Sequence, residues 1–208
     1  MDRSCERMER IRVVIAEQDD TFRKNLKEML TQSGYLVVGD SGDGMSALKM
    51  VRAIQPELVL AEAGLPGMTG LELAHIIEEG RLAAVVLMVD YAEKELVRNH
   101  HDRWTFPVLV KPFEEFQLLS VLEYSHMAYT KMVNLEHEVL RLRGDLETRK
   151  VVEKAKGILM RVHGLSEGAA FKKMQQQSMK KRTPMKKVAE AVIMAYEISE
   201  ENIKKKKR

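Results

Sequence analysis

The chain has 208 residues, of which 45% are hydrophobic, so it can bury the core of one or two domains and wholesale disorder is excluded. Its one cysteine, Cys5, excludes an internal disulfide and a cysteine-based zinc site. No secretory signal and no uncharged apolar run of about 18 residues is present, so we expect a soluble, cytoplasmic protein without membrane contact.

Charge is distributed unevenly along the chain. Residues 131–208 contain 20 Lys and Arg against 10 Asp and Glu, whereas residues 1–130 contain 14 against 21. An acidic first half and a basic second half indicate two modules with different partners. The basic module is a candidate for binding nucleic acid, and a merely solvated charged surface is the alternative.

The first half alternates short runs rich in β-branched residues with amphipathic stretches of helical length. The predicted strands are Ile11–Ala16, Leu36–Val38, Leu58–Ala61, Val85–Val89 and Val108–Val110. The predicted helices are Thr21–Ser33, Met45–Ile54, Leu71–Glu79, Ala92–His100 and a long segment that begins near Phe113. This alternation predicts an α/β fold, a (βα)5 unit with a parallel sheet.

The long segment continues without proline to Met160, and apolar residues recur in it at spacings of three and four. One seam position is filled by Leu118, Ser125, Met132, Val139 and Leu146, and the other by Val121, Ala128, Leu135, Leu142 and Arg149. This heptad pattern predicts a homodimeric coiled coil over residues 118–150. A long amphipathic helix packed on its own domain is the alternative.

Residues 151–198 predict a small all-α unit of three helices joined by short turns. The helices are expected over Val151–His163, from Ser166 to about Met179, and over Met185–Glu197. Residues 199–208 end in KKKKR and predict a disordered basic tail.

Residues 10–125 resemble a response-regulator receiver domain. The strand–helix order, the turn from Leu65 to Gly70 and the Lys111-Pro112-Phe113 segment carry the resemblance. It implies a phosphoacceptor Asp after the third strand, carboxylates that hold Mg²⁺, a hydroxyl group and a lysine. These positions hold Glu62 for the phosphoacceptor, Glu17 and Gln18 for the acidic pair, Val89 for the hydroxyl, and Lys111 for the lysine.

Three of these residues predict that phosphoryl transfer is lost. Glu62 is longer than Asp, Gln18 offers a neutral oxygen where Mg²⁺ prefers charge, and Val89 has no hydroxyl. We therefore expect a pseudo-receiver without catalytic residues, metal or cofactor. Two interpretations of Glu62 stay open: its charge pairs with Lys111 and imitates the phosphorylated state, or it is a relic in a dimerisation scaffold.

Residues 151–195 resemble the ANTAR domain. The resemblance rests on the Ala155-Lys156-Gly157-Ile158-Leu159-Met160 segment and on Gly164, Glu167, Ala170, Ser178-Met179 and Val188-Ala189 after it. It implies an RNA-binding transcription antiterminator that binds paired hairpins in nascent leader RNA as a dimer. A sensor protein or the transcription machinery would be a further partner.

The candidate RNA-binding residues combine basic side chains with two small residues. They are Lys154, Lys156, Gly157, Arg161, Ser178, Lys180, Lys181 and Arg182. Lysine and arginine side chains can contact the phosphates along an RNA backbone. Gly157, at an expected turn, would allow the protein backbone to approach the RNA closely, and Ser178 offers a hydrogen bond to a base edge.

Two other functions are compatible with parts of the pattern. A DNA-binding response regulator of a two-component system also has a small helical effector domain, although the basic turn after the second helix fits the ANTAR pattern better than a recognition helix. A protein-interaction scaffold with a charged surface is the other. An enzyme fits least, because the sequence contains no phosphate-binding glycine loop, catalytic triad or metal-ligand cluster.

Overall fold

The computed structural model describes residues 10–93 and 106–206, and side chains up to residue 199. It divides into two compact units, residues 1–134 and residues 135–208, which are described separately below as the receiver unit and the helical unit. The helix expected at Ala92–His100 falls mainly on residues outside the described ranges. Among the described helices, none has the length and apolar character needed to cross a membrane.

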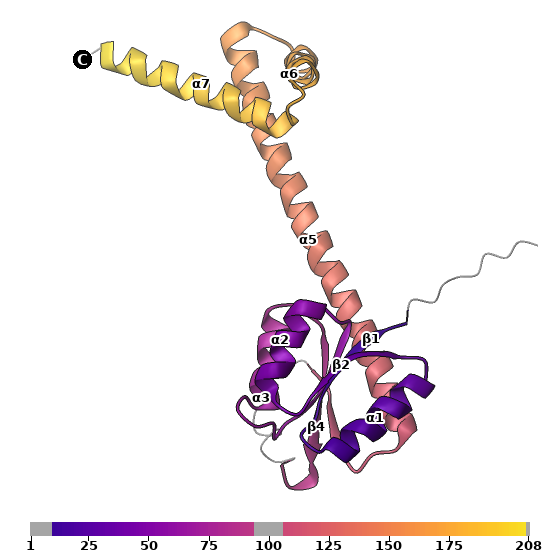
Figure 1. Ribbon diagram of the computed structural model, residues 1–208. Helices are drawn as coiled ribbons and strands as arrows, with labels where there is room; N and C mark the ends of the chain where they lie inside the picture. Colours follow the sequence, from indigo (N-terminus) through magenta and orange to yellow (C-terminus); the bar gives the residue numbers. More distant parts are fainter. Residues whose placement is uncertain (1–9, 94–105, 207–208) are drawn as a thin grey trace, which may run out of the picture. The chain divides into compact units, whose positions relative to one another are not determined.

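The receiver unit is built on a five-stranded parallel sheet (Figure 1). Its strands are β1 (Arg12–Ala16), β2 (Leu36–Ser41), β3 (Leu58–Glu62), β4 (Ala84–Asp90) and β5 (Val108–Lys111). Their order in the sheet is β2-β1-β3-β4-β5, so the chain reverses direction across the sheet between β1 and β3. The predicted α/β fold is confirmed, and this reversal point is where open parallel sheets place a functional site.

Helices cover both faces of the sheet. They are α1 (Asp20–Gln32), α2 (Gly44–Ile54), α3 (Gly70–Glu79), the short 3₁₀ helix η1 (Tyr91–Glu93) and the long α5 (Glu115–His163). On one face α1 and α5 bury Leu26, Leu30, Leu118 and Leu122 against the strands. On the other face α2 and α3 bury Leu48, Val51, Leu73 and Ile77. Both faces are covered, which explains why the central strands are apolar throughout.

Local signals at the carboxyl ends of the strands fix the turns that form the site. The Asp19 carboxylate caps α1 by accepting from the amides of Thr21 and Phe22. Thr69 and Glu72 form a capping box at the start of α3. Gly70 is required there, because a Cβ at this position would collide with the carbonyl oxygen of Glu62.

The first part of α5 belongs to the receiver unit and not to a coiled coil. Leu118 and Leu122 are fully buried against the sheet, and the Ser125 hydroxyl donates to the Val85 carbonyl oxygen at 3.3 Å. The predicted coil therefore begins too early at residue 118. The alternative of a helix packed on its own domain is correct for this part, since the same apolar spacing serves both arrangements.

The helical unit contains the end of α5 together with α6 (Glu167–Lys181) and α7 (Met185–Lys206). Its core consists of Val152, Ala155, Leu159, Ala170, Met174 and Ala189. Two predictions are wrong here. The turn expected near Gly157 is absent because α5 continues through that residue, and the tail expected from residue 199 is helical as far as Lys206.

Candidate functional site

One lysine and two glutamates meet at the carboxyl ends of β1, β3 and β5. The Lys111 ammonium donates to Glu17 Oε2 and to Glu62 Oε1, at 2.8 Å in each case. The side chains of Glu17, Glu62 and Lys111 are 1%, 15% and 16% exposed. We call these three residues the carboxylate–lysine triad. The sequence predicted that they lie together, and the structure confirms it.

The remaining carboxylate oxygens of the triad also have donors. Glu62 Oε2 accepts from the Gln18 amide at 3.0 Å, and Glu17 Oε1 accepts from the Asp19 amide at 3.1 Å. Gln18 thus takes part in the site through its backbone amide. The identity of its side chain could not predict this hydrogen bond. Each oxygen of the two carboxylates is satisfied within the chain.

Burial raises the pKa of both carboxyl groups of the triad and the hydrogen bond from Lys111 lowers it, and the balance differs between Glu17 and Glu62. Burial raises the pKa of Glu17 above its usual value, because desolvation penalises the charged form. Burial acts in the same direction on Glu62, but hydrogen bonds from Lys111 and Gln18 outweigh it and lower the pKa of Glu62. The pKa of Lys111 is raised, because its two glutamate partners outweigh the loss of hydration. The triad thus keeps the Lys111 cation and the Glu62 anion together.

The donor set does not fit a divalent cation. The glutamate oxygens are engaged by Lys111 and by backbone amides, and the Asp19 carboxylate caps α1. The position expected to hold a hydroxyl is Val89, which is buried in the apolar cluster on the α2–α3 side of the sheet. Among the described residues, no group of three or more His, Cys, Asp or Glu is placed to bind a metal ion. The Mg²⁺ that the receiver fold implies therefore has no site of the usual kind.

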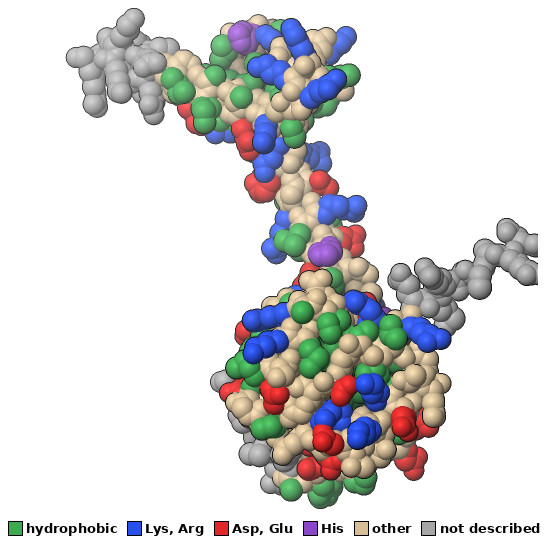
Figure 2. Space-filling view, viewed as in Figure 1, with side chains coloured by type: hydrophobic (Ala, Val, Ile, Leu, Met, Phe, Trp, Pro, Cys, Tyr) green, Lys and Arg blue, Asp and Glu red, His purple; other side chains and the backbone are tan. Residues whose placement is uncertain are grey.

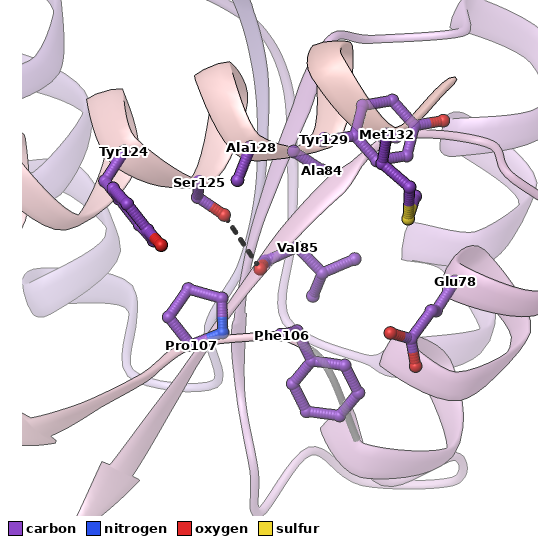
Figure 3. Close-up of a pocket in the computed structure, with 11 residues that line it drawn as sticks. Glu78, Ala84, Val85, Phe106, Pro107, Tyr124, Ser125, Ala128, Tyr129 and Met132 are labelled. Atoms are coloured by element: carbon purple, nitrogen blue, oxygen red, sulfur yellow. Dashed lines mark hydrogen bonds between the residues drawn. The ribbon is translucent and has the colours of Figure 1, made fainter. Parts of the chain in front are cut away.

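A separate apolar pocket lies at the amino ends of β4 and β5. It has a volume of about 170 Å³ and lies between α3 and α5 (Figure 3). Its lining residues include Phe106, Pro107, Tyr124, Tyr129 and Met132. Because the triad lies at the opposite edge of the sheet, where the strands have their carboxyl ends, this pocket is not part of that site.

The predicted RNA-binding residues on α5 behave differently from one another. Lys156 is only 8% exposed, and its ammonium contacts Glu153 at 2.8 Å and Glu167 at 2.7 Å. Its charge is paired within the chain, so Lys156 does not present a free cation to solvent, and its contact with RNA stays a prediction. The spacing of three between Glu153 and Lys156 was the sequence signal for this pairing.

The other three candidates on α5 lie at the surface. Lys154 pairs with Glu197 at 3.0 Å, and both side chains are 60% exposed. The Arg161 guanidinium lies over the Tyr196 ring, 5.8 Å from its centroid. Gly157 lies within the helix with open space beside it. These residues are accessible, but Lys154 and Arg161 already have partners on α7.

Lys180 and Lys181 in the last turn of α6 and Arg182, which caps the helix, are exposed, and we call these three residues the basic turn. The turn is fixed by hydrogen bonds to neighbouring backbone: the Ser178 hydroxyl donates to Thr183 O at 2.6 Å, and the Thr183 amide donates to Ser178 O at 3.0 Å. Arg182 caps α6 in a left-handed conformation with φ 49°. Ser178 therefore uses its proton to hold the turn, whereas the sequence had suggested a contact to a base.

The three basic side chains of this turn have no ion-pair partner within the described ranges of the chain. Lys172 and Lys173 are also exposed on α6 and were not singled out from the sequence. Lys and Arg side chains gather on the face of the helical unit that Figure 2 shows. The unit presents positive charge to solvent, which suits a polyanion.

The fold and the triad define a response regulator whose receiver lacks the usual phosphorylation residues and which carries a helical effector unit. Residues 13–123 match the response regulator receiver domain, and residues 140–193 match the ANTAR domain. The chain belongs to the family of response regulators with a C-terminal ANTAR domain, a family of transcription regulators.

Relatives of known name or structure agree with this membership. The transcriptional regulatory protein PdtaR of Mycobacterium tuberculosis is 38% identical over 182 residues, which cover 88% of this chain and 89% of PdtaR. The receiver domain of the putative response regulator NarL from the same organism has a TM-score of 0.51 at 23% identity, covering 58% of this chain and 97% of its own. A receiver domain of a putative LuxO repressor from Vibrio parahaemolyticus has a TM-score of 0.54 at 18% identity, covering 61% and 98%. The two structures support the receiver fold alone.

Proposed function

We propose that this protein is an RNA-binding transcription antiterminator that binds paired hairpins in nascent leader RNA. The observation that carries the proposal is the exposed basic turn, Lys180–Arg182, within the segment that matches the ANTAR domain. A turn that is held by hydrogen bonds and presents three cations without ion-pair partners among the described residues fits phosphate contacts on either side of an RNA loop. The proposal also places its action in the cytoplasm, where nascent RNA is made, and gives the chain no catalytic activity.

Two hairpins require two helical units, and we propose that a homodimer supplies them. The proposal is supported by the apolar seam of α5, which is exposed from Leu135 to Leu146. Linking two binding events in one complex raises the effective concentration of the second unit, so the dimer binds a two-hairpin RNA more tightly than a single unit does.

The same proposal makes RNA binding independent of phosphorylation. The ion pair between Glu62 and Lys111 supports the interpretation that Glu62 acts as a permanent negative charge next to the receiver lysine. Glu17 holds the same ammonium from the other side. Both charges are engaged inside the chain, so no incoming phosphoryl group is needed to engage the lysine.

Shift assays with purified full-length protein test the proposal. We expect binding to an RNA with two hairpins, weaker binding to either hairpin alone, and weaker binding still to duplex DNA of equal length. The affinity for RNA should fall steeply as salt rises, because lysine and arginine contacts release counterions from the backbone. Preference for duplex DNA would overturn the proposal in favour of a DNA-binding response regulator. A single-round transcription assay with a leader terminator then measures read-through with and without the protein.

A further inference from the structure

One face of α6 exposes an aromatic side chain. The helical unit contains two Phe and Tyr residues, Phe171 and Tyr196. The Arg161 guanidinium already lies over the Tyr196 ring. Phe171, in contrast, is 42% exposed, whereas Ala170 and Met174 on the same helix are 0% and 1% exposed. Phe171 therefore lies at the edge of the core and presents part of its side chain to solvent.

A glutamine and a methionine continue this face along α6. Gln175 and Met179 follow Phe171 at intervals of four residues, so the three side chains are successive neighbours on the helix surface. Gln175 is exposed, and Met179 is 73% exposed. Within the described ranges of the chain, the Gln175 amide has no hydrogen-bond partner. We call Phe171, Gln175 and Met179 the α6 strip, which combines a ring, an amide that can donate and accept, and a flexible apolar side chain.

Lysines flank the α6 strip. Lys172 and Lys180 each follow a residue of the strip by one position, and both are exposed. Neither has an ion-pair partner among the residues that the structure describes. Cations beside an exposed ring favour a ligand that carries both negative charge and flat apolar groups, and single-stranded nucleic acid has both in its phosphates and its bases.

We propose that the α6 strip binds an unpaired base of an RNA hairpin loop, which stacks on the Phe171 ring while the Gln175 amide hydrogen-bonds to the edge of the base. The proposal rests on the proposed function, and it assigns base recognition to the strip and phosphate contact to the basic turn beside it. Every base has a π face, so stacking on Phe171 contributes affinity with little preference among bases. An amide distinguishes the donors and acceptors of a base edge, so Gln175 contributes preference for one base.

Binding of base-deleted RNA to full-length Phe171→Leu tests the stacking. The probe is a two-hairpin RNA that the wild type selects from a pool with randomised loops, together with derivatives in which one loop position is abasic in both hairpins. We expect Phe171→Leu to bind the intact RNA about tenfold more weakly, with an unchanged salt slope because the cations remain. At the stacked position, removing the base should weaken wild-type binding by a similar factor and should not weaken binding to Phe171→Leu any further.

Two further variants control this experiment. Phe171→Trp keeps a stacking surface and should bind the intact RNA like the wild type. Its added fluorescence should be quenched by the intact RNA but not by the RNA that is abasic at the stacked position, with the wild type and its one tryptophan, Trp104, as the background. Phe116→Leu changes a phenylalanine that is 78% exposed in the receiver unit and should leave RNA affinity unchanged. Circular dichroism reports whether each variant folds, and the quenching decides if Phe171→Leu does not.

Sequencing of the RNAs that Gln175→Ala selects from the same pool tests the base preference. We expect the preference at one loop position to be lost while the preferences at the other positions stay as in the wild type. Gln177→Ala is the matched control, because Gln177 is also exposed but two positions along a helix point to different sides. It should select the same loops as the wild type.

Other outcomes overturn the proposal. If Phe171→Leu and base removal weaken binding additively at every loop position, Phe171 does not stack on a base, and the proposed function stands without this inference. If Gln175→Ala selects the same loops as the wild type, Gln175 does not read the base. If the wild type itself selects no hairpin RNA from the pool, the proposed function fails and this inference fails with it.

Discussion

Each unit of the molecule surrounds one lysine with two glutamates, and the two clusters differ in burial. In the receiver unit, Lys111 holds Glu17 and Glu62, whose side chains are 1% and 15% exposed. In the helical unit, Lys156 holds Glu153 and Glu167, whose side chains are 55% and 68% exposed. If the lysine is removed, water can hydrate the glutamates of the second cluster but hardly those of the first. The same lysine substitution should therefore lower stability more in the receiver unit than in the helical unit.

The two units also differ in whether their charged side chains have partners within the chain. The receiver unit satisfies the carboxylates of Glu17 and Glu62 internally, so these groups are not held ready for a ligand. The helical unit leaves the basic turn without ion-pair partners among the described residues. The proposed function rests on this difference: it assigns a fixed state to the receiver unit and the RNA-binding surface to the helical unit.

Removing the lysine of the buried cluster should have the largest effect on stability. Lys111→Met leaves two buried carboxylates facing each other, which we expect to cost about 3 kcal/mol of unfolding free energy near neutral pH. Without the ammonium, the pKa of both carboxyl groups in the folded state lies above the unfolded value, so stability is lost as pH rises through that range. Urea unfolding at about pH 4.5 and about pH 7.5 should show the larger deficit at the higher pH.

Two variants control this experiment. Lys24→Met removes an exposed lysine of α1 and should change stability by less than about 0.5 kcal/mol. Adding Glu62→Gln to Lys111→Met removes one of the facing charges and should recover part of the loss. A deficit in Lys111→Met that does not depend on pH would contradict the assigned electrostatic role.

Reversing charge in the basic turn should have the largest effect on RNA binding. Lys181→Glu with Arg182→Glu removes two cations that neutralise phosphates and adds repulsion, so we expect affinity for two-hairpin RNA to fall by about ten- to a hundredfold. The salt dependence should also become shallower, by roughly one unit of slope for each phosphate that is no longer neutralised. The matched reversal of Lys49 and Arg52, exposed on α2, should leave both quantities unchanged.

Loosening the turn should have a smaller effect than reversing its charge. Ser178→Ala removes the hydrogen bond to the Thr183 carbonyl and should lower stability by about 1 kcal/mol. RNA affinity should drop a few-fold while the salt slope stays at the wild-type value, because the cations remain. Ser120→Ala, which removes an exposed hydroxyl bonded within α5, is the control. A changed slope in Ser178→Ala would mean that Ser178 contacts RNA directly.

The exposed lysine–glutamate cluster should give the smallest effect. Lys156→Met should lower the unfolding temperature by less than Lys111→Met and leave the salt slope of RNA binding unchanged. Its glutamate partners remain hydrated, and Lys156 itself is not presented to solvent. A reduced salt slope would instead support the sequence-based prediction that Lys156 contacts phosphate.

The sequence predicted those features that depend on local pattern. Alternating strands and helices defined the sheet, and the motifs around Glu62 and Lys111 placed the triad at one edge of it. The sequence could not separate two arrangements that share one apolar spacing, a helix packed on its own domain and a coiled-coil seam. Leu118 and Leu135 belong to the same heptad pattern, yet Leu118 is buried in the receiver unit and Leu135 is exposed. The sequence also did not reveal the internal partners of Lys156 and Ser178, because residue type alone does not tell whether a polar group is satisfied by its own chain.

The most direct measurement is the affinity of untreated full-length protein for a two-hairpin RNA, repeated after incubation with acetyl phosphate and Mg²⁺. We predict specific binding before treatment, no acyl-phosphate by mass spectrometry after it, and the same affinity within error. A stable Mg²⁺-dependent acyl-phosphate accompanied by an affinity increase of about tenfold or more, equivalent to about 1.4 kcal/mol, would contradict the account.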